Sequence, residues 1–151
     1  MIFWNKNLPY KTGEAVRTIK TKILIVEDEM ILASDVKYQL EELGYNVVGI
    51  VNNGKDAIKL TLETDPDVIL MDIVIKGDID GIETAQQINK LYNIPIIYTT
   101  AYFDEEILER AKKTEPYGYI IKPYQEGQIH TAILMAIHRH QQDQKIRKIN
   151  L

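Results

Sequence analysis

The sequence predicts a doubly wound α/β fold built on one parallel sheet of five strands. Five short apolar runs have the length and composition of buried parallel strands, and segments with helical periodicity alternate with them. This alternation is typical of repeated βαβ units. Polar side chains stand at the ends of four of these runs, where the carboxyl ends of parallel strands share one crevice.

The elements can be placed in chain order from these patterns. The expected strands are Lys22–Val26, Val47–Val51, Val68–Met71, Pro95–Thr99 and Gly118–Ile121. Helical spacing of apolar residues predicts a helix after each strand. The five sets are Leu32, Val36, Leu40 and Leu43; Ala57, Ile58 and Leu62; Ile82, Ala85 and Ile88; a weaker, acidic stretch from about Phe103 to Lys112; and Ile129, Ala132, Ile133, Ala136 and Ile137.

Capping signals delimit three of the helices. Gly44 is placed to end the first helix, and the pair Asp65-Pro66 ends the second. Asp80 and Glu83 have the spacing of a capping box, which places the start of the third helix between them.

Length and composition indicate one domain. A chain of 151 residues with 45% hydrophobic content can build one well-packed core but not two. We expect a leader over residues 1–20 that is partly ordered or mobile, a domain over 21–137, and a C-terminal helical extension or linker over 138–151. The sequence shows neither a signal peptide nor a membrane-spanning run, so we expect a cytoplasmic protein without membrane insertion.

The net charge of −4 is unevenly distributed. Residues 1–20 and residues 138–151 each carry a net +3, which leaves −10 on residues 21–137. A nucleic-acid interface needs a basic surface that replaces counterions on phosphate. We therefore expect no direct contact between this domain and nucleic acid.

The polar residues at the strand ends form a chemically coherent set. Glu27 and Asp28 follow the first strand, Asp72 the third, Thr100 the fourth and Lys122 the fifth. Carboxylates gathered at a buried strand end favour a shared divalent cation, since like charges repel without one. An aspartate beside a cation can also act as a nucleophile toward phosphorus.

With these residues in this order, the chain resembles the receiver domain of two-component response regulators from Lys22 to about Ile137. The motifs TTAY and YIIKPY around Thr100 and Lys122 match that family in place and order. The resemblance implies a flavodoxin-like sheet of order 2-1-3-4-5 with five helices. It also implies a phosphorylation-controlled switch that assists its own phosphorylation and dephosphorylation and is not a conventional turnover enzyme.

The resemblance implies a role for each site residue. Asp72 would accept the phosphoryl group from a histidine kinase or phosphotransfer protein, and Thr100 and Lys122 would bind the phosphoryl oxygens. Magnesium (Mg2+) would be bound by Asp28 and Asp72, by Glu27 largely through water, and by the backbone carbonyl of Val74.

The resemblance also implies a switch. Tyr119 would move inward as Thr100 is drawn toward the phosphoryl group, and the Lys122–Pro123 peptide would be cis. The surface of the fourth helix, fifth strand and fifth helix would then contact an output protein or form a homodimer.

The sequence departs from the family pattern between Asp72 and Gly81. The stretch IVIKGDIDG is one residue longer than usual and lacks the common proline, and Glu27 stands where an aspartate is frequent. Two other functions are alternatives. One is a receiver-like interaction module that works without phosphorylation. The other is a phosphatase of the haloacid-dehalogenase type, which needs a second aspartate where Val74 stands.

Overall fold

The computed structural model describes residues 20–101 and 104–149. Its five strands form one parallel sheet in the order β2-β1-β3-β4-β5. The strands are β1 (Lys22–Val26), β2 (Asn46–Val51), β3 (Val68–Asp72), β4 (Ile96–Thr100) and β5 (Gly118–Ile121). The helices are α1 (Met30–Glu42), α2 (Gly54–Thr64), α3 (Gly81–Leu91), α4 (Glu105–Lys112) and α5 (Gln128–Ile149). The predicted fold class and strand order are confirmed. Apart from Lys20, the predicted leader lies outside the described residues.

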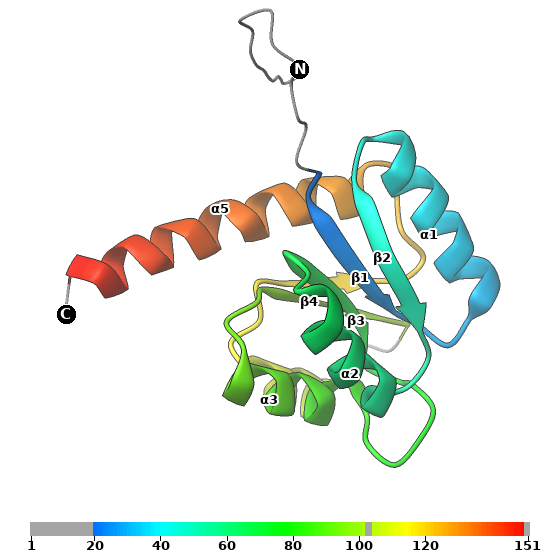
Figure 1. Cartoon of the computed structure of the whole chain (residues 1–151). Helices are drawn as coiled ribbons and strands as arrows, with labels where there is room; N and C mark the ends of the chain where they lie inside the picture. Colours follow the sequence, from blue (N-terminus) through cyan, green and yellow to red (C-terminus); the bar gives the residue numbers. More distant parts are fainter. Residues whose placement is uncertain (1–19, 102–103, 150–151) are drawn as a thin grey trace, which may run out of the picture.

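Helices cover both faces of the sheet (Figure 1). Along β1, Ile23 and Ile25 point into the core under α1 and α5, whereas Leu24 and Val26 point into the core under α2, α3 and α4. All four side chains are almost fully buried. A strand buried on both faces must be apolar at every position, which explains the continuous apolar run in the sequence.

Two strands end one residue later than predicted. β4 begins at Ile96 because Pro95 has no N–H to donate, and its carbonyl accepts a hydrogen bond from Ile69 N at 3.1 Å. At the other end, Asp72 pairs with Thr99 and Thr100 pairs with Ile121, so β3 ends with Asp72 and β4 ends with Thr100. Both site residues thus belong to the sheet itself rather than to the loops after it.

The capping signals are present as predicted. Gly44 has φ +97, and Asp65 closes α2 with φ 48. Asp80 accepts from Glu83 N at 2.8 Å while the Glu83 side chain accepts from Asp80 N at 3.0 Å, which is a full capping box. The fourth helix, predicted from about Phe103 to Lys112, begins at Glu105 with Asp104 as its N-cap and ends at Lys112; Phe103 lies outside the described residues.

Helix α5 continues to Ile149, well past Ile137, and its second half projects away from the sheet in Figure 1. It is fastened to the start of β5, where the Tyr117 hydroxyl donates to Asp143 and the Arg139 guanidinium lies 4.9 Å from the Tyr117 ring centroid. No described helix is both long enough and apolar enough to cross a bilayer.

Candidate functional site

The carboxyl ends of β1, β3, β4 and β5 bring the predicted residues to one edge of the sheet. Glu27 directly follows β1, Asp72 ends β3, Thr100 ends β4 and Lys122 directly follows β5. β1 and β3 are neighbours, as are β3 and β4, and β4 and β5, and all run parallel. The topology alone therefore places these four side chains at the same end of the sheet.

Three carboxylates form a compact acidic cluster. One oxygen from each of Glu27, Asp28 and Asp72 lies within 4.8 Å of the others. Glu27 and Asp72 are buried, whereas Asp28 is partly exposed. Oxygen ligands at this spacing, open to solvent on one side, suit a hard divalent cation that keeps some of its waters.

Lys122 reaches into the cluster from the end of β5. Its Nζ lies 2.6 Å from Glu27 Oε1 and 2.9 Å from Asp72 Oδ2. Its backbone N–H donates to Thr100 O at 2.8 Å, and the Lys122–Pro123 peptide is cis, as the resemblance implied. The lysine is therefore held at both its backbone and its ammonium.

The close approach of these charges perturbs their titration. Burial raises the pKa of Glu27 to about 7, even though its hydrogen bond from Lys122 opposes the shift. Burial alone would lower the pKa of Lys122, but hydrogen bonds to Glu27 and Asp72 outweigh it and raise that pKa above its ordinary value. Lys122 is therefore a permanent cation beside the Asp72 carboxylate.

The orientation of Asp72 is fixed from two sides. Val74 N donates to Asp72 Oδ1 at 3.0 Å, which leaves Oδ2 for Lys122. Gly81 N donates to Ile73 O at 2.8 Å, and a Cβ on Gly81 would lie only 2.1 Å from the Asp72 carbonyl oxygen. The start of α3 therefore packs directly on the backbone that carries Asp72, in a place where only glycine fits.

The long loop after β3 is paired with the chain that follows β2. Lys76 forms an isolated parallel bridge with Asn53, and Lys76 N donates to Asn52 O at 3.1 Å. Gly77 has φ +97 and turns the chain back toward α3. This pairing could not be predicted from the sequence, because bridges between distant loops leave no periodic pattern.

Thr100 and Tyr119 lie on the neighbouring strands β4 and β5. Thr100 is fully buried. The Tyr119 ring packs edge-on against the buried Tyr98 ring, with centroids 6.5 Å apart. The Tyr119 hydroxyl is buried without a hydrogen-bond partner among the described residues, and burial raises its pKa.

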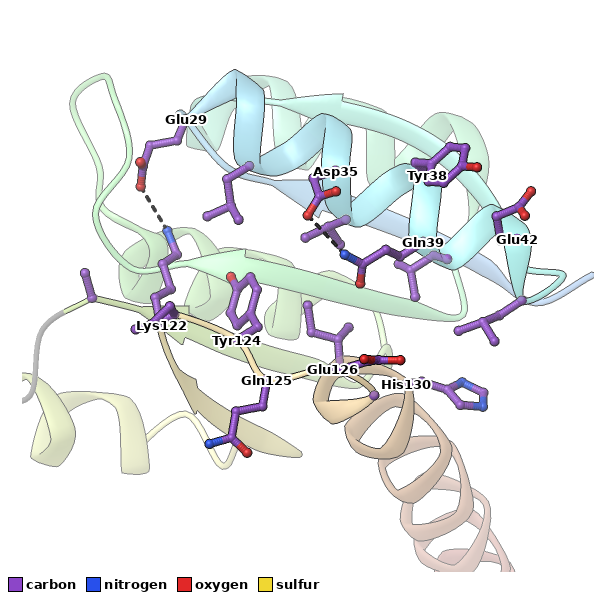
Figure 2. Close-up of a pocket in the computed structure, with 18 residues that line it drawn as sticks. Glu29, Asp35, Tyr38, Gln39, Glu42, Lys122, Tyr124, Gln125, Glu126 and His130 are labelled. Carbon is purple, nitrogen blue, oxygen red and sulfur yellow. Dashed lines mark hydrogen bonds and ion pairs between the residues drawn. The ribbon is translucent and has the colours of Figure 1, made fainter.

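A groove of about 940 Å³ opens beside Lys122, between α1 and the segment that joins β5 to α5 (Figure 2). Glu29 lies at the upper left of this view and His130 at the lower right. The Glu29 carboxylate is 3.5 Å from Lys122 Nζ, a contact that was not predicted from the sequence. In the sequence, the only sign of a role for Glu29 is that it continues the acidic run of Glu27 and Asp28.

Comparison with known proteins identifies the family. The chain matches the response regulator receiver domain over residues 23–134. The transcriptional regulatory protein PdtaR of Mycobacterium tuberculosis is 31% identical over 128 residues, which cover 85% of this chain and 62% of that protein. The phyllosphere-induced regulator PhyR of Methylorubrum extorquens is 32% identical over 125 residues, which cover 82% of this chain and 46% of that protein. The chain thus spans less than two thirds of these relatives.

A solved structure agrees with the match. The signal receiver domain of a modulated diguanylate cyclase from Desulfovibrio desulfuricans G20 is 39% identical and superposes with a TM-score of 0.78, covering 83% of this chain and 99% of that domain. The fold, the order of the strands and the sequence match agree. The chain belongs to the response regulator receiver domain family, which is a family of signalling regulators and not of enzymes.

Proposed function

We propose that this chain is a phosphorylation-controlled signalling switch that accepts a phosphoryl group on Asp72. The observation that carries the proposal is the Asp72 carboxylate, buried at the end of β3, with the Lys122 ammonium 2.9 Å away. An Asp72 oxygen would attack phosphorus in line while the bond from phosphorus to the donor's leaving atom breaks. The leaving atom takes the electron pair, and an acyl phosphate forms.

Magnesium belongs to the same proposal. The carboxylates of Asp28 and Asp72 would bind the ion directly, Glu27 largely through water, and the Val74 carbonyl would complete the protein ligands. The three carboxylates fit this ion by their oxygen donors and their spacing within 4.8 Å. When bound, magnesium supplies positive charge that offsets the repulsion between the carboxylate and an anionic phosphoryl group.

Lys122 and Thr100 would bind the phosphoryl oxygens. Lys122 stays cationic, so it can stabilise negative charge that develops on the transferred group. Thr100 is one strand away and would turn its hydroxyl toward the new acceptor. The Tyr119 ring, whose buried hydroxyl has no partner in the described part of the chain, would then change its packing.

We propose a histidine kinase or phosphotransfer protein as the donor and a protein as the output partner. The groove of Figure 2 reaches Lys122 at one end, which makes it a suitable surface for the donor. A cytoplasmic location belongs to the same proposal. The charge of −10 on residues 21–137 supports an output that does not contact nucleic acid directly.

A homodimer through α4, β5 and α5 is part of the proposal. Leu134 and Met135 on α5 are 53% and 60% exposed, and Ile146 and Ile149 extend the apolar surface beyond the sheet. Light scattering of the beryllofluoride-bound chain, with and without residues 138–151, tests it. A monomer at high micromolar concentration in both cases would count against the dimer.

Acetyl phosphate provides the test of the phosphoacceptor. Intact-mass measurement should show one phosphoryl adduct on the wild type with magnesium, and none on Asp72→Asn or with excess chelator. The same adduct on Asp72→Asn would defeat the assignment. No adduct under any condition would favour the receiver-like module that works without phosphorylation. Continuous turnover of the donor without a lasting adduct would favour a phosphatase.

A further inference from the structure

We propose that Glu29, at the mouth of the site, competes with the incoming phosphoryl group for the Lys122 ammonium; the inference rests on the proposed function of Asp72. Lys122 Nζ contacts three carboxylates in the described chain, at 2.6 Å from Glu27, 2.9 Å from Asp72 and 3.5 Å from Glu29. The first two side chains are 4% and 5% exposed, whereas that of Glu29 is 66% exposed.

The position of Glu29 in the fold makes this contact unusual. Glu29 is the N-cap of α1, yet its side chain accepts no hydrogen bond from the helix. The N-cap side chains of α2, α3 and α4 all do, and a missing cap weakens a helix. The Glu29 side chain instead extends across the crevice toward Lys122 (Figure 2). Glutamate is not among the residues preferred at an N-cap, unlike the asparagine and aspartates of the other helices, and attraction to the ammonium favours this orientation.

The Lys122 ammonium has few N–H donors, so Glu29 and an incoming phosphoryl oxygen would compete for them. An ammonium has three N–H groups, and three carboxylates already surround that of Lys122. A phosphoryl oxygen that approaches the ammonium therefore competes with these carboxylates for it. Glu29 makes the longest contact and is the most exposed of the three, so it is the one that solvent can best accommodate after release.

Removal of the Glu29 charge should therefore favour phosphorylation. With acetyl phosphate and saturating magnesium, Glu29→Gln should be phosphorylated about two- to fivefold faster than the wild type, the range expected for an exposed ion pair. The affinity for beryllofluoride, an equilibrium measurement without turnover, should rise by the same factor. Glu41→Gln, which removes an exposed charge near the far end of α1 and outside the groove, should match the wild type in both.

The conservative variant Glu29→Asp separates contact from charge. Aspartate is a good N-cap, and its shorter side chain should turn back to the α1 backbone and leave Lys122. Glu29→Asp should therefore be phosphorylated as fast as Glu29→Gln, although it keeps the charge. If Glu29→Asp behaves like the wild type, the charge acts only through its field and the inference is overturned.

The result for the wild type shows whether a failure concerns this inference or the proposed function. A wild type that forms no adduct would overturn the proposed function and this inference with it. A wild type that is phosphorylated while Glu29→Gln is no faster, or only as fast as Glu41→Gln, would overturn this inference alone.

Discussion

The contact between Gly81 and the backbone of Asp72 gives a prediction with a matched control. A Cβ at Gly81 would lie 2.1 Å from Asp72 O, 2.8 Å from Ile73 Cα and 2.9 Å from Asp72 C. All three are backbone atoms and cannot rotate away. In Gly49→Ala the nearest atom is almost as close, 2.3 Å, but it is the Cδ2 tip of the Leu60 side chain, and the next atom is 3.6 Å away.

The two substitutions should therefore differ in cost despite similar overlaps. Overpacking costs about 1–3 kcal/mol, and Gly81→Ala should lie at the upper end because α3 must move by roughly 1 Å. Reduced entropy of the unfolded chain returns up to about 1 kcal/mol to either variant. The free energy of unfolding should thus fall by about 2 kcal/mol for Gly81→Ala and stay within about 1 kcal/mol of the wild type for Gly49→Ala.

Urea unfolding followed by circular dichroism measures the difference. With a urea dependence of about 2 kcal/mol per molar, the Gly81→Ala midpoint should lie about 1 M below that of the wild type. Gly81→Ala should also be phosphorylated more slowly, because the shift displaces Asp72. Equal midpoints for the two variants would refute the argument that the start of α3 fixes the backbone of Asp72.

Three further predictions concern Lys122, His130 and Thr100. Lys122→Met should lower the free energy of unfolding by about 3 kcal/mol at neutral pH, because it leaves two buried carboxylates facing each other. Magnesium should restore much of that loss. Lys112→Met, which removes an exposed lysine, should hardly change the free energy of unfolding. If thermal unfolding shows similar losses of stability for the two variants, the buried position of Lys122 does not have the effect that we expect. Burial lowers the pKa of His130 in the folded protein. The stability that neutral His130 contributes is therefore fully present above the unfolded pKa of about 6.5, and it is lost as the pH falls toward the lower folded pKa. When the pH is lowered from about 7.5 to about 5.5, the urea midpoint should therefore fall less in His130→Gln than in the wild type. Identical pH profiles for the two proteins would show that His130 does not cause this loss of stability. Thr100→Ala should still accept phosphate but lose the conformational response, so amide chemical shifts around Tyr119 that move equally in both proteins would show that the coupling runs elsewhere.

Those residues of the site that are positioned by the ends of the strands could be predicted from the sequence. Glu27, Asp72 and Lys122 stand at the ends of apolar runs, and parallel strands bring such ends together whatever the details of packing. The capping box of Asp80 and Glu83 was equally accessible, because it depends on residue types three positions apart.

Contacts that depend on packing between distant segments could not be predicted in this way. The approach of Gly81 to Asp72 and the bridge between Lys76 and Asn53 depend on how a nine-residue stretch folds back, and no periodicity encodes that path. The contact of Glu29 with Lys122 depends on a side-chain rotamer at the start of α1. Residue type alone would have favoured an ordinary acidic helix end, which is stabilised by the helix dipole.

Chemical identification of the modified residue tests the central claim most directly. Borohydride reduces an acyl phosphate to an alcohol, so a phosphorylated aspartate is read as homoserine in a peptide map. After treatment with acetyl phosphate and magnesium, homoserine should be found at position 72 alone, and it should disappear when magnesium is chelated. Reduction at Glu27 or Asp28 instead, or a stable adduct that resists borohydride, would contradict the assignment of Asp72 as the phosphoacceptor.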